Sequence, residues 1–96
     1  STFEWIDFSD VKNNAIAYMR RSRSEQLLCV HNFSPNYVKN YHLHVPNARG
    51  LVELFNSDAE AYGGSGKTNA FVDVNGQQAT FQLAPLSTMI FQVYYS

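Results

Sequence analysis

The sequence predicts an all-β fold, an antiparallel Greek-key β-sandwich of about 7–8 strands, and three observations support it. No segment shows sustained helical periodicity. Short apolar or alternating runs are instead separated by turn residues at intervals of roughly 8–12 positions, the spacing of a sandwich or barrel. Six Tyr and seven Phe add to the preference for strands. Because 96 residues are enough for one small domain, we expect residues 1–96 to form a single unit.

Seven runs are typical of strands, and each is bounded by turn residues. They span residues 14–20, 26–33, 38–45, 51–55, 70–74, 79–83 and 87–95. The polar turn SRSE joins the first two, and Pro35 breaks the second because proline cannot donate a ladder hydrogen bond. The turn PNARG, residues 46–50, separates the third strand from the fourth.

Two of these strands alternate between apolar and polar residues, so one face of each is expected to be buried. The expected inward-facing side chains are Tyr41, Leu43 and Val45 in the third strand and Ala70, Val72 and Val74 in the fifth. Asn75-Gly76 follows the fifth strand and is a strong hairpin signal, because both residues tolerate positive φ. A hairpin should therefore join the fifth strand to the sixth.

The first, second and last strands are apolar on both faces. The last strand carries Met89, Phe91 and Val93 on one face and Ile90 and Tyr94 on the other. A two-layer sandwich needs only one apolar face per strand, so some apolar surface lacks an internal partner. Either the N-terminal segment FEWIDF, residues 3–8, covers this surface, or the surface docks onto a second domain outside this chain.

Composition argues against several classes of function. With 7 basic and 8 acidic residues the net charge is −1, so no general field attracts nucleic acid or an anionic membrane. The basic run RRSR, residues 20–23, is typical of a solvated turn, and no apolar run approaches the roughly 20 residues that span a bilayer. The single cysteine, Cys29, is expected to be a buried thiol. We therefore expect no nucleic-acid or membrane partner, no cofactor and a cytoplasmic location.

The stretch AYGGSGKT, residues 61–68, resembles a phosphate-binding loop whose first Gly is replaced by Ala. Such a loop must run from a buried strand into a helix N-terminus. Here the following residues, NAFVDVNG, form a β-branched run that closes on a hairpin turn, and the sequence has no βαβ pattern. We therefore reject nucleotide binding. Gly63, Gly64 and Gly66 are expected to form a tight loop that needs positive φ or close backbone approach.

The longer stretch ELFNSDAEAYGGSGKTN, residues 53–69, resembles a motif in the C-terminal domain of bacterial 1,4-α-glucan (glycogen) branching enzymes, members of the α-amylase superfamily. In that family a strand ends in Leu-Asn-Ser/Thr-Asp, followed by an acidic residue and Tyr-Gly-Gly-Ser-Gly. The matching residues are Asn56, Ser57, Asp58, Glu60, Tyr62, Gly63, Gly64, Ser65 and Gly66. Phe55 stands where the family has Leu.

Other blocks agree in the family's order, and together they cover nearly the whole chain. FEWID (3–7) resembles the segment after the last helix of the family's catalytic barrel, and AYMRR (17–21) resembles its first sandwich strand. VHNFSP (30–35) resembles an Asn-Phe-Thr/Ser-Pro corner, and LAPLSTMIF (83–91) resembles the final strand with Ala in place of the first Pro. The loop motif is the specific one. After Gly66 the chain departs from the family, which often has another Gly-rich segment there.

The resemblance implies a non-catalytic C-terminal domain of an enzyme that cleaves α-1,4-glucan links and forms α-1,6 branches with retention, in glycogen biosynthesis. In that family the nucleophilic Asp and the acid/base Glu belong to the barrel, so no residue of this chain is expected to be catalytic. Asp58 and Glu60 lie two apart on a loop and are expected to serve loop hydrogen bonding or solvation. The implied partner is the catalytic barrel of the same polypeptide, outside residues 1–96.

We expect the loop 56–66 to face that barrel and to fix the two domains together. Its expected interface residues are Asn56, Asp58, Tyr62, Gly63, Gly64 and Gly66. Asp58 would hold its own backbone through an Asx-type bond, the glycines would allow close approach, and Tyr62 would offer a ring and a hydroxyl. A self-contained loop without a partner is the alternative.

The second functional hypothesis is an autonomous carbohydrate-binding module for α-glucan or glycogen, because sugar rings stack on flat, exposed aromatic rings. Core packing is the competing interpretation for such rings. The aromatic candidates are Trp5, Tyr37, Tyr41, Tyr62, Tyr94 and Tyr95, of which Trp5, Tyr62 and Tyr94 are preferred. His42 and His44 share one strand face, a spacing that can ligate a metal, and His31 is a third candidate ligand. The pattern offers no carboxylate or Cys at matching spacing, so we expect a solvated strand face and no metal.

Overall fold

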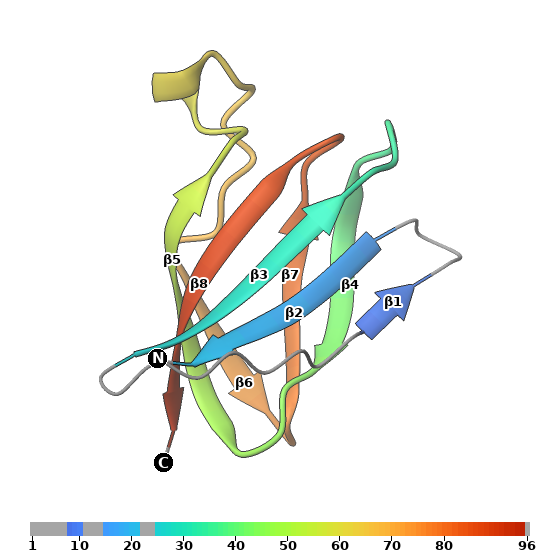
Figure 1. The fold of residues 1–96 in the computed structure, drawn as a ribbon. Coiled ribbons are helices and arrows are strands. Elements are labelled where there is room, and N and C mark those ends of the chain that lie inside the picture. The colour runs from blue at the N-terminus through green and yellow to red at the C-terminus, as the bar shows by residue number, and fades with distance from the viewer. Residues whose placement is uncertain (1–7, 11–14, 22–24, 96) are drawn as a thin grey trace.

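The computed structural model describes residues 8–10, 15–21 and 25–95, and this part of the chain forms eight strands and one short 3-10 helix, η1 (Figure 1). The strands are β1 (Phe8–Asp10), β2 (Ala15–Arg21), β3 (Gln26–Asn32), β4 (Val38–His44), β5 (Ala48–Asn56), β6 (Phe71–Asn75), β7 (Gln78–Leu83) and β8 (Thr88–Tyr95), and η1 is Glu60–Tyr62. The all-β prediction is confirmed. Each predicted strand corresponds to one of β2 to β8, with small differences at the ends.

All strand pairs are antiparallel, and the hydrogen-bonded order is β1-β2-β3-β8-β5-β6-β7-β4. The sheet curls into two layers, with β2, β3 and β8 in front in Figure 1 and β4 and β7 behind them. β5 pairs with β8 on one side and with β6 on the other, so β5 and β6 connect the layers. The consecutive strands β3, β4 and β5 are not neighbours, as in a Greek-key arrangement.

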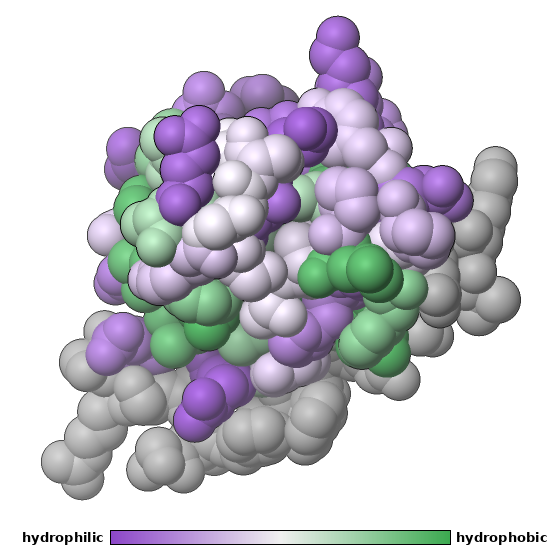
Figure 2. Space-filling view, turned by 90° about the horizontal axis from the view of Figure 1, so that it is seen from above, coloured by the Kyte–Doolittle hydropathy of each residue, from purple (hydrophilic) through white to green (hydrophobic). Residues whose placement is uncertain are grey.

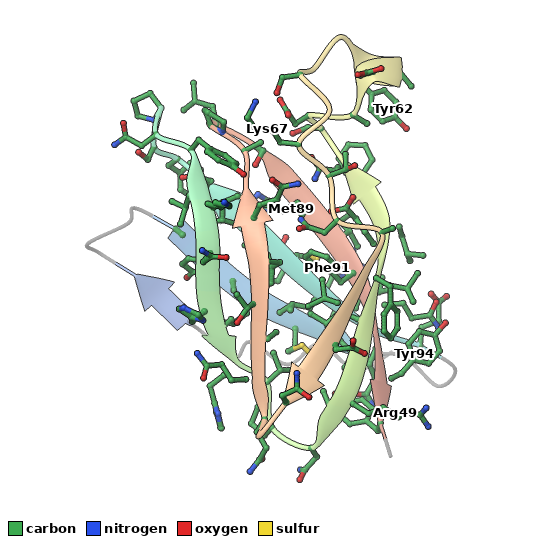
Figure 3. All side chains as sticks on the ribbon, turned by 180° about the vertical axis from the view of Figure 1, so that it is seen from behind. Arg49, Tyr62, Lys67, Met89, Phe91 and Tyr94 are labelled. Atoms are coloured by element: carbon green, nitrogen blue, oxygen red, sulfur yellow. The ribbon has the colours of Figure 1, made fainter. Side chains whose placement is uncertain are left out.

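The apolar core lies between the two layers. Phe81 of β7 and Phe91 of β8 join them, with ring centroids 5.1 Å apart. Tyr41 of β4 packs edge-on against Phe81 at 5.7 Å. Figure 3 shows Met89 and Phe91 pointing into this space. Full burial of a side chain of this size stabilises a fold by about 1.5–3 kcal/mol, so these rings contribute to the core packing together with buried aliphatic residues such as Leu28, Leu51 and Leu83.

The predicted alternation is confirmed in β4 and β8 and is partly wrong in β6. Tyr41, Leu43, Val45, Met89, Phe91 and Val93 are all buried, whereas Ile90 is half-buried and Tyr94 is exposed. In β6, Val72 is buried and Val74 packs against the core. Ala70 was expected to face inward but is exposed, because it precedes the strand and belongs to the end of the long loop.

The predicted hairpin between β6 and β7 is present, but its turn lies one residue later than the dipeptide Asn75-Gly76 indicates. Asn75 pairs with Gln78, so the two central residues are Gly76 and Gln77. Both have positive φ, 58° and 64°, as a type I′ turn requires. The strand therefore continues through Asn75.

The turn PNARG is shorter than predicted, because β5 already begins at Ala48. Asn47, with a φ of 64°, makes the reversal. Gly50 was expected in the turn but lies inside β5, where the pairing with β8 shifts between Ala48 and Gly50. A glycine at such an irregularity often allows a close approach, and the ring of Phe71 occupies the space beside it.

Several expectations concern residues at the edge of, or outside, the described ranges. Residues 3–7 of the predicted edge cover, Trp5 among them, and residues 22–24 of the turn SRSE lie outside these ranges. The first described strand, β1, pairs with β2.

Cys29 is a free, buried thiol. Within the described part, no helix has the length and apolar character needed to cross a membrane, and no three His, Cys, Asp or Glu side chains are grouped to hold a metal.

Candidate domain-docking surface

The loop between β5 and β6 is built around the carboxylate of Asp58. Its Oδ2 accepts hydrogen bonds from the Ser65 hydroxyl at 2.6 Å and from the Lys67 backbone N–H at 2.9 Å, and its Oδ1 accepts the Ser65 backbone N–H at 3.3 Å. The Ser65 hydroxyl above all, together with these backbone groups, holds the pKa of Asp58 below its ordinary value. Asp58 is therefore an ionised structural acceptor at neutral pH.

The predicted Asx-type bond exists, but Asn56 makes it rather than Asp58. The Asn56 side-chain oxygen accepts the Asp58 backbone N–H at 2.8 Å. The Asp58 carboxylate instead reaches across the loop to residues seven and nine positions later. The two side chains thus share the task, because Asn56 starts the turn and Asp58 closes it.

Two glycines of the loop are required by its geometry. A Cβ on Gly64 would overlap the backbone carbonyl of Asp58, so only glycine allows this approach. Gly66 has a φ of 87° and donates its backbone N–H to the Asp58 carbonyl at 2.8 Å. Gly63, with a φ of 84°, ends η1. The expectation of a tight loop with positive φ and close backbone approach is confirmed.

Three polar residues that the sequence did not single out tie the loop to the sandwich. The Glu53 carboxylate accepts hydrogen bonds from the Asn56 side chain at 3.0 Å and from the Asn69 backbone N–H at 3.0 Å. The Asn69 amide in turn pairs with the backbone of Gln82 through two bonds of 3.0 Å. Glu53 was predicted only as a strand residue of LVELF and as the start of the stretch 53–69, without a role of its own, and nothing in local spacing indicates these pairings.

Tyr62 is held at the outer end of this loop. Its side chain is 66% exposed, and its ring contacts that of Phe55 at a centroid distance of 5.4 Å. Figure 3 shows Tyr62 at one end of the molecule. A rigid loop thus presents a large ring to solvent, and Phe55 fixes the position of that ring.

The outer face of β2, β3 and β8 continues from this ring pair. Ile90 of β8 lies opposite Phe55 on one side and opposite Cys29 on the other, and Cys29 lies opposite Tyr18. Directly opposite residues share a face, so the row is continuous across four strands. Burial raises the pKa of Tyr18 and of Cys29, so both groups are neutral at pH 7.

A second row runs beside the first. His31 stacks between Tyr18 and Phe33, at ring-centroid distances of 5.5 and 6.0 Å. Its ring nitrogens lie 3.0 Å from the Thr88 hydroxyl and 3.3 Å from the Tyr18 hydroxyl. Ile16, opposite His31, is 37% exposed and Phe33 is 52% exposed. His31 therefore serves this face and is not associated with His42, whose Nδ1 lies 2.9 Å from Thr80 Oγ1 on the other layer.

We call these two rows, with the ring pair above them, the outer patch. It consists of Ile16, Tyr18, Cys29, His31, Phe33, Phe55, Tyr62 and Ile90. Figure 2 looks down on the end of the molecule that carries the loop, and hydrophobic side chains appear there in patches between hydrophilic ones. The strand register shows that the outer face of β2, β3 and β8 carries apolar side chains, as predicted for the first, second and last strands, together with polar ones such as Thr88 and Gln92.

Comparison with known proteins gives the family. The sequence profile described as "Alpha amylase, C-terminal all-beta domain" matches residues 5–94. This chain belongs to that family. Among solved structures, a MUTB mutant soaked with trehalulose has a TM-score of 0.60 at 22% identity over 97% of the chain, and the isomaltulose synthase of Erwinia rhapontici has 0.53 at 22% over 94%. The chain corresponds to 14% of each, and this likeness concerns the fold alone.

Curated relatives are more similar in sequence. A protein of Protochlamydia amoebophila named 1,4-alpha-glucan branching enzyme GlgB is 45% identical over 96% of the chain. A GlgB of Rhizobium meliloti is 39% identical over 94%. The chain spans about 14% of the length of the first of these and 13% of the second. This family domain is therefore a small part of the relatives it matches.

The structure groups some of the predicted site residues and separates others. Asn56, Asp58, Tyr62, Gly63, Gly64 and Gly66 form one loop as expected. Tyr94 lies near the opposite end of the molecule from Tyr62 (Figure 3). Tyr41, a weaker aromatic candidate, is a core residue. Trp5 lies outside the described residues.

Proposed function

We propose that this chain is the non-catalytic C-terminal domain of a 1,4-α-glucan branching enzyme, and that its outer patch docks onto the catalytic barrel of the same polypeptide. The whole enzyme would cleave α-1,4 links and form α-1,6 branches in glycogen, in the cytoplasm. The observation that carries the proposal is the 45% identity to a branching enzyme of which the chain covers only 14%.

The chemistry of the loop supports a non-catalytic role. Retaining glycoside chemistry needs one carboxyl as a nucleophile and another as an acid, facing each other across a substrate. The oxygens of Asp58 are occupied by Ser65 and the Lys67 backbone, so this carboxylate is not available as a nucleophile. Its lowered pKa also makes it a poor acid at neutral pH.

The outer patch supports the choice of partner. Large side chains such as Phe33 and Tyr62 are more than half exposed on a small domain. Their burial against a neighbour would be favourable at about 25 cal/mol per Å². The matched relatives extend far beyond this domain, so the remainder of the same polypeptide is available to cover the patch. It needs no diffusional encounter, because the chain connection holds it nearby.

The test is Tyr62→Ala in the intact polypeptide. We expect a lower unfolding midpoint and reduced formation of α-1,6 branches, because the ring that Phe55 orients would be lost from the interface. Tyr62→Phe should keep most of both properties, since the ring remains. Leu86→Ala, at a residue 68% exposed and outside the outer patch, is the matched control.

Two outcomes would contradict different parts of the proposal. If the intact polypeptide forms no α-1,6 branches from an α-1,4-glucan, the enzyme assignment fails. If it does, but Tyr62→Ala changes neither stability nor activity, the docking role of the loop fails.

A further inference from the structure

A hollow of about 350 Å³ lies on the outer surface where β5, β6 and β8 meet, away from Tyr62. It is lined by Arg49, Gly50, Val52, Phe71, Tyr94 and Tyr95. Phe71 is 57% exposed and Tyr94 is 43% exposed. Figure 3 shows Arg49 and Tyr94 together at the end of the molecule opposite Tyr62. Aromatic rings thus line the hollow beside a single cationic side chain.

The ring of Phe71 lies directly over Gly50. A Cβ at Gly50 would lie 2.8 Å from Cζ of the Phe71 ring, so any larger residue there would displace the ring. Gly50 pairs with Tyr94 of β8 and with Asp73 of β6, which places these residues beside the Phe71 ring. The missing side chain therefore lets Phe71 rest against the backbone of β5 with much of its ring open to solvent.

Phe71 also borders a second hollow of about 370 Å³ on its other side. The other lining residues there are His42, Val72, Asp73, Asn75, Gln78 and Thr80. Most of them are polar and exposed, and they offer amide, carboxylate, hydroxyl and imidazole groups. Phe71 thus stands between an aromatic hollow and a polar one.

We propose that these two hollows form one binding site for a segment of α-1,4-glucan, with Phe71 and Tyr94 as stacking platforms. A glucose ring has an apolar C–H face that packs on an aromatic ring, and its edge carries hydroxyls that need polar partners. Arg49 would donate to hydroxyl oxygens in the first hollow, while Asp73 and Gln78 would bind hydroxyls in the second. A few fixed polar groups beside aromatic walls are the usual composition of such sites.

Charge and position favour this occupant over others. Arg49 is the single cation in the first hollow, and Asp73 borders the second, so a phosphorylated or other polyanionic ligand is disfavoured. Tyr94 is four residues along β8 from Ile90 of the outer patch, roughly 13 Å at the usual strand rise. Ile90 and Tyr94 lie on the same face of β8, so the inference requires that a barrel seated on the patch ends before Tyr94 and leaves the hollows open. The inference rests on the proposed function, since it takes its ligand from the glucan that the enzyme would modify.

The test measures retention of the intact polypeptide during native electrophoresis in gels that contain glycogen, with competition by maltoheptaose. We expect Phe71→Ala and Tyr94→Ala each to weaken binding at least about threefold, and the double variant to weaken it by roughly tenfold. Phe71→Tyr keeps the platform and should bind within about twofold of the parent. Leu86→Ala should bind like the parent. The urea midpoint of each variant shows that the domain is folded.

Each remaining outcome decides the inference. If the parent is not retained by glycogen, or if the Phe71 and Tyr94 variants are retained equally well, the glucan site is refuted. Equal weakening by Leu86→Ala would also refute it, because the effect would not belong to the hollows. Branching activity is measured in a separate assay. If the parent binds glycogen through Phe71 but forms no branches, the proposed enzyme function is wrong, whereas the proposed glucan site is retained.

Discussion

At the scale of single residues, Asp58 decides whether the glycine loop keeps its shape. Its pKa in the folded chain lies below the unfolded value of about 3.9, so its ionised form stabilises the fold above that pH. This contribution is lost as the pH falls through the lower, folded pKa. We predict that Asp58→Asn lowers the urea midpoint at pH 7 and that its difference from the parent narrows below about pH 4.

The control for this prediction is Asp73→Asn. Asp73 is exposed on β6, and its replacement leaves the hydrogen bonds of the loop intact. It should change the midpoint little at pH 7. A gap between Asp58→Asn and the parent that is as large at pH 3 as at pH 7 would contradict the role given to the ionised carboxylate.

The second prediction at this scale concerns Gly64. A Cβ at this position meets the backbone of Asp58, and backbone cannot rotate away as a side chain does. We predict that Gly64→Ala lowers the free energy of unfolding by about 3 kcal/mol, near the upper end of overpacking costs. Gly63 has open space around it, so Gly63→Ala should cost only the left-handed backbone penalty of about 1 kcal/mol. Urea unfolding compares the two, and equal costs would show that the loop relaxes freely around Gly64.

At the scale of elements, substitutions in the turn of the β6–β7 hairpin can measure the cost of a left-handed backbone without a change in packing. Gly76 has a φ of 58°, and no heavy atom lies within 4 Å of the place its Cβ would take. We predict that Gly76→Ala costs about 1–2 kcal/mol, all of it from the left-handed conformation. Gln77→Ala keeps the same positive φ and loses one exposed hydrogen bond, which the Gln77 side-chain oxygen accepts from the Asn47 backbone N–H at 3.2 Å, so it should cost about 0.5 kcal/mol, the lower end for one bond. Thermal unfolding of both variants is the measurement, and a reversed order would contradict the turn assignment.

The strands show which local sequence patterns are sufficient to predict a buried face or a strand boundary. Alternation in 38–45 predicted the buried face of β4, because a period of two leaves only one set of side chains for the core. The beginning of β5 was missed because Gly50 is equally typical of a turn. Its actual reason is the ring of Phe71, 21 positions later in the chain, and local spacing cannot reveal such a contact.

At the scale of the whole molecule, the sequence predicted more of the loop than of its attachment. The glycines and Asp58 are visible as a motif because each answers a local requirement. The pairs Glu53–Asn69 and Asn69–Gln82 join residues 16 and 13 positions apart. The residues of each pair are neighbours only because of the positions of β5 and β7 in the folded domain, which local sequence patterns do not reveal. The apolar residues on both sides of the strands predicted a face without an internal partner. Which rings are neighbours on that face, such as Tyr18 and His31, depends on the strand register, and the sequence alone does not give the register.

That face leads to the last prediction, which concerns how the domain unfolds within the intact polypeptide. If the outer patch is buried against the barrel, the two domains should stabilise each other and unfold in one calorimetric transition. Phe33→Lys would place a charge in this apolar contact, where an unpaired charge is expensive to bury. We predict that the single transition then splits, with the domain unfolding first. Leu86→Lys adds the same charge outside the patch and should leave one transition. A single, unshifted transition for Phe33→Lys would show that Phe33 remains in water and that the barrel does not cover this face.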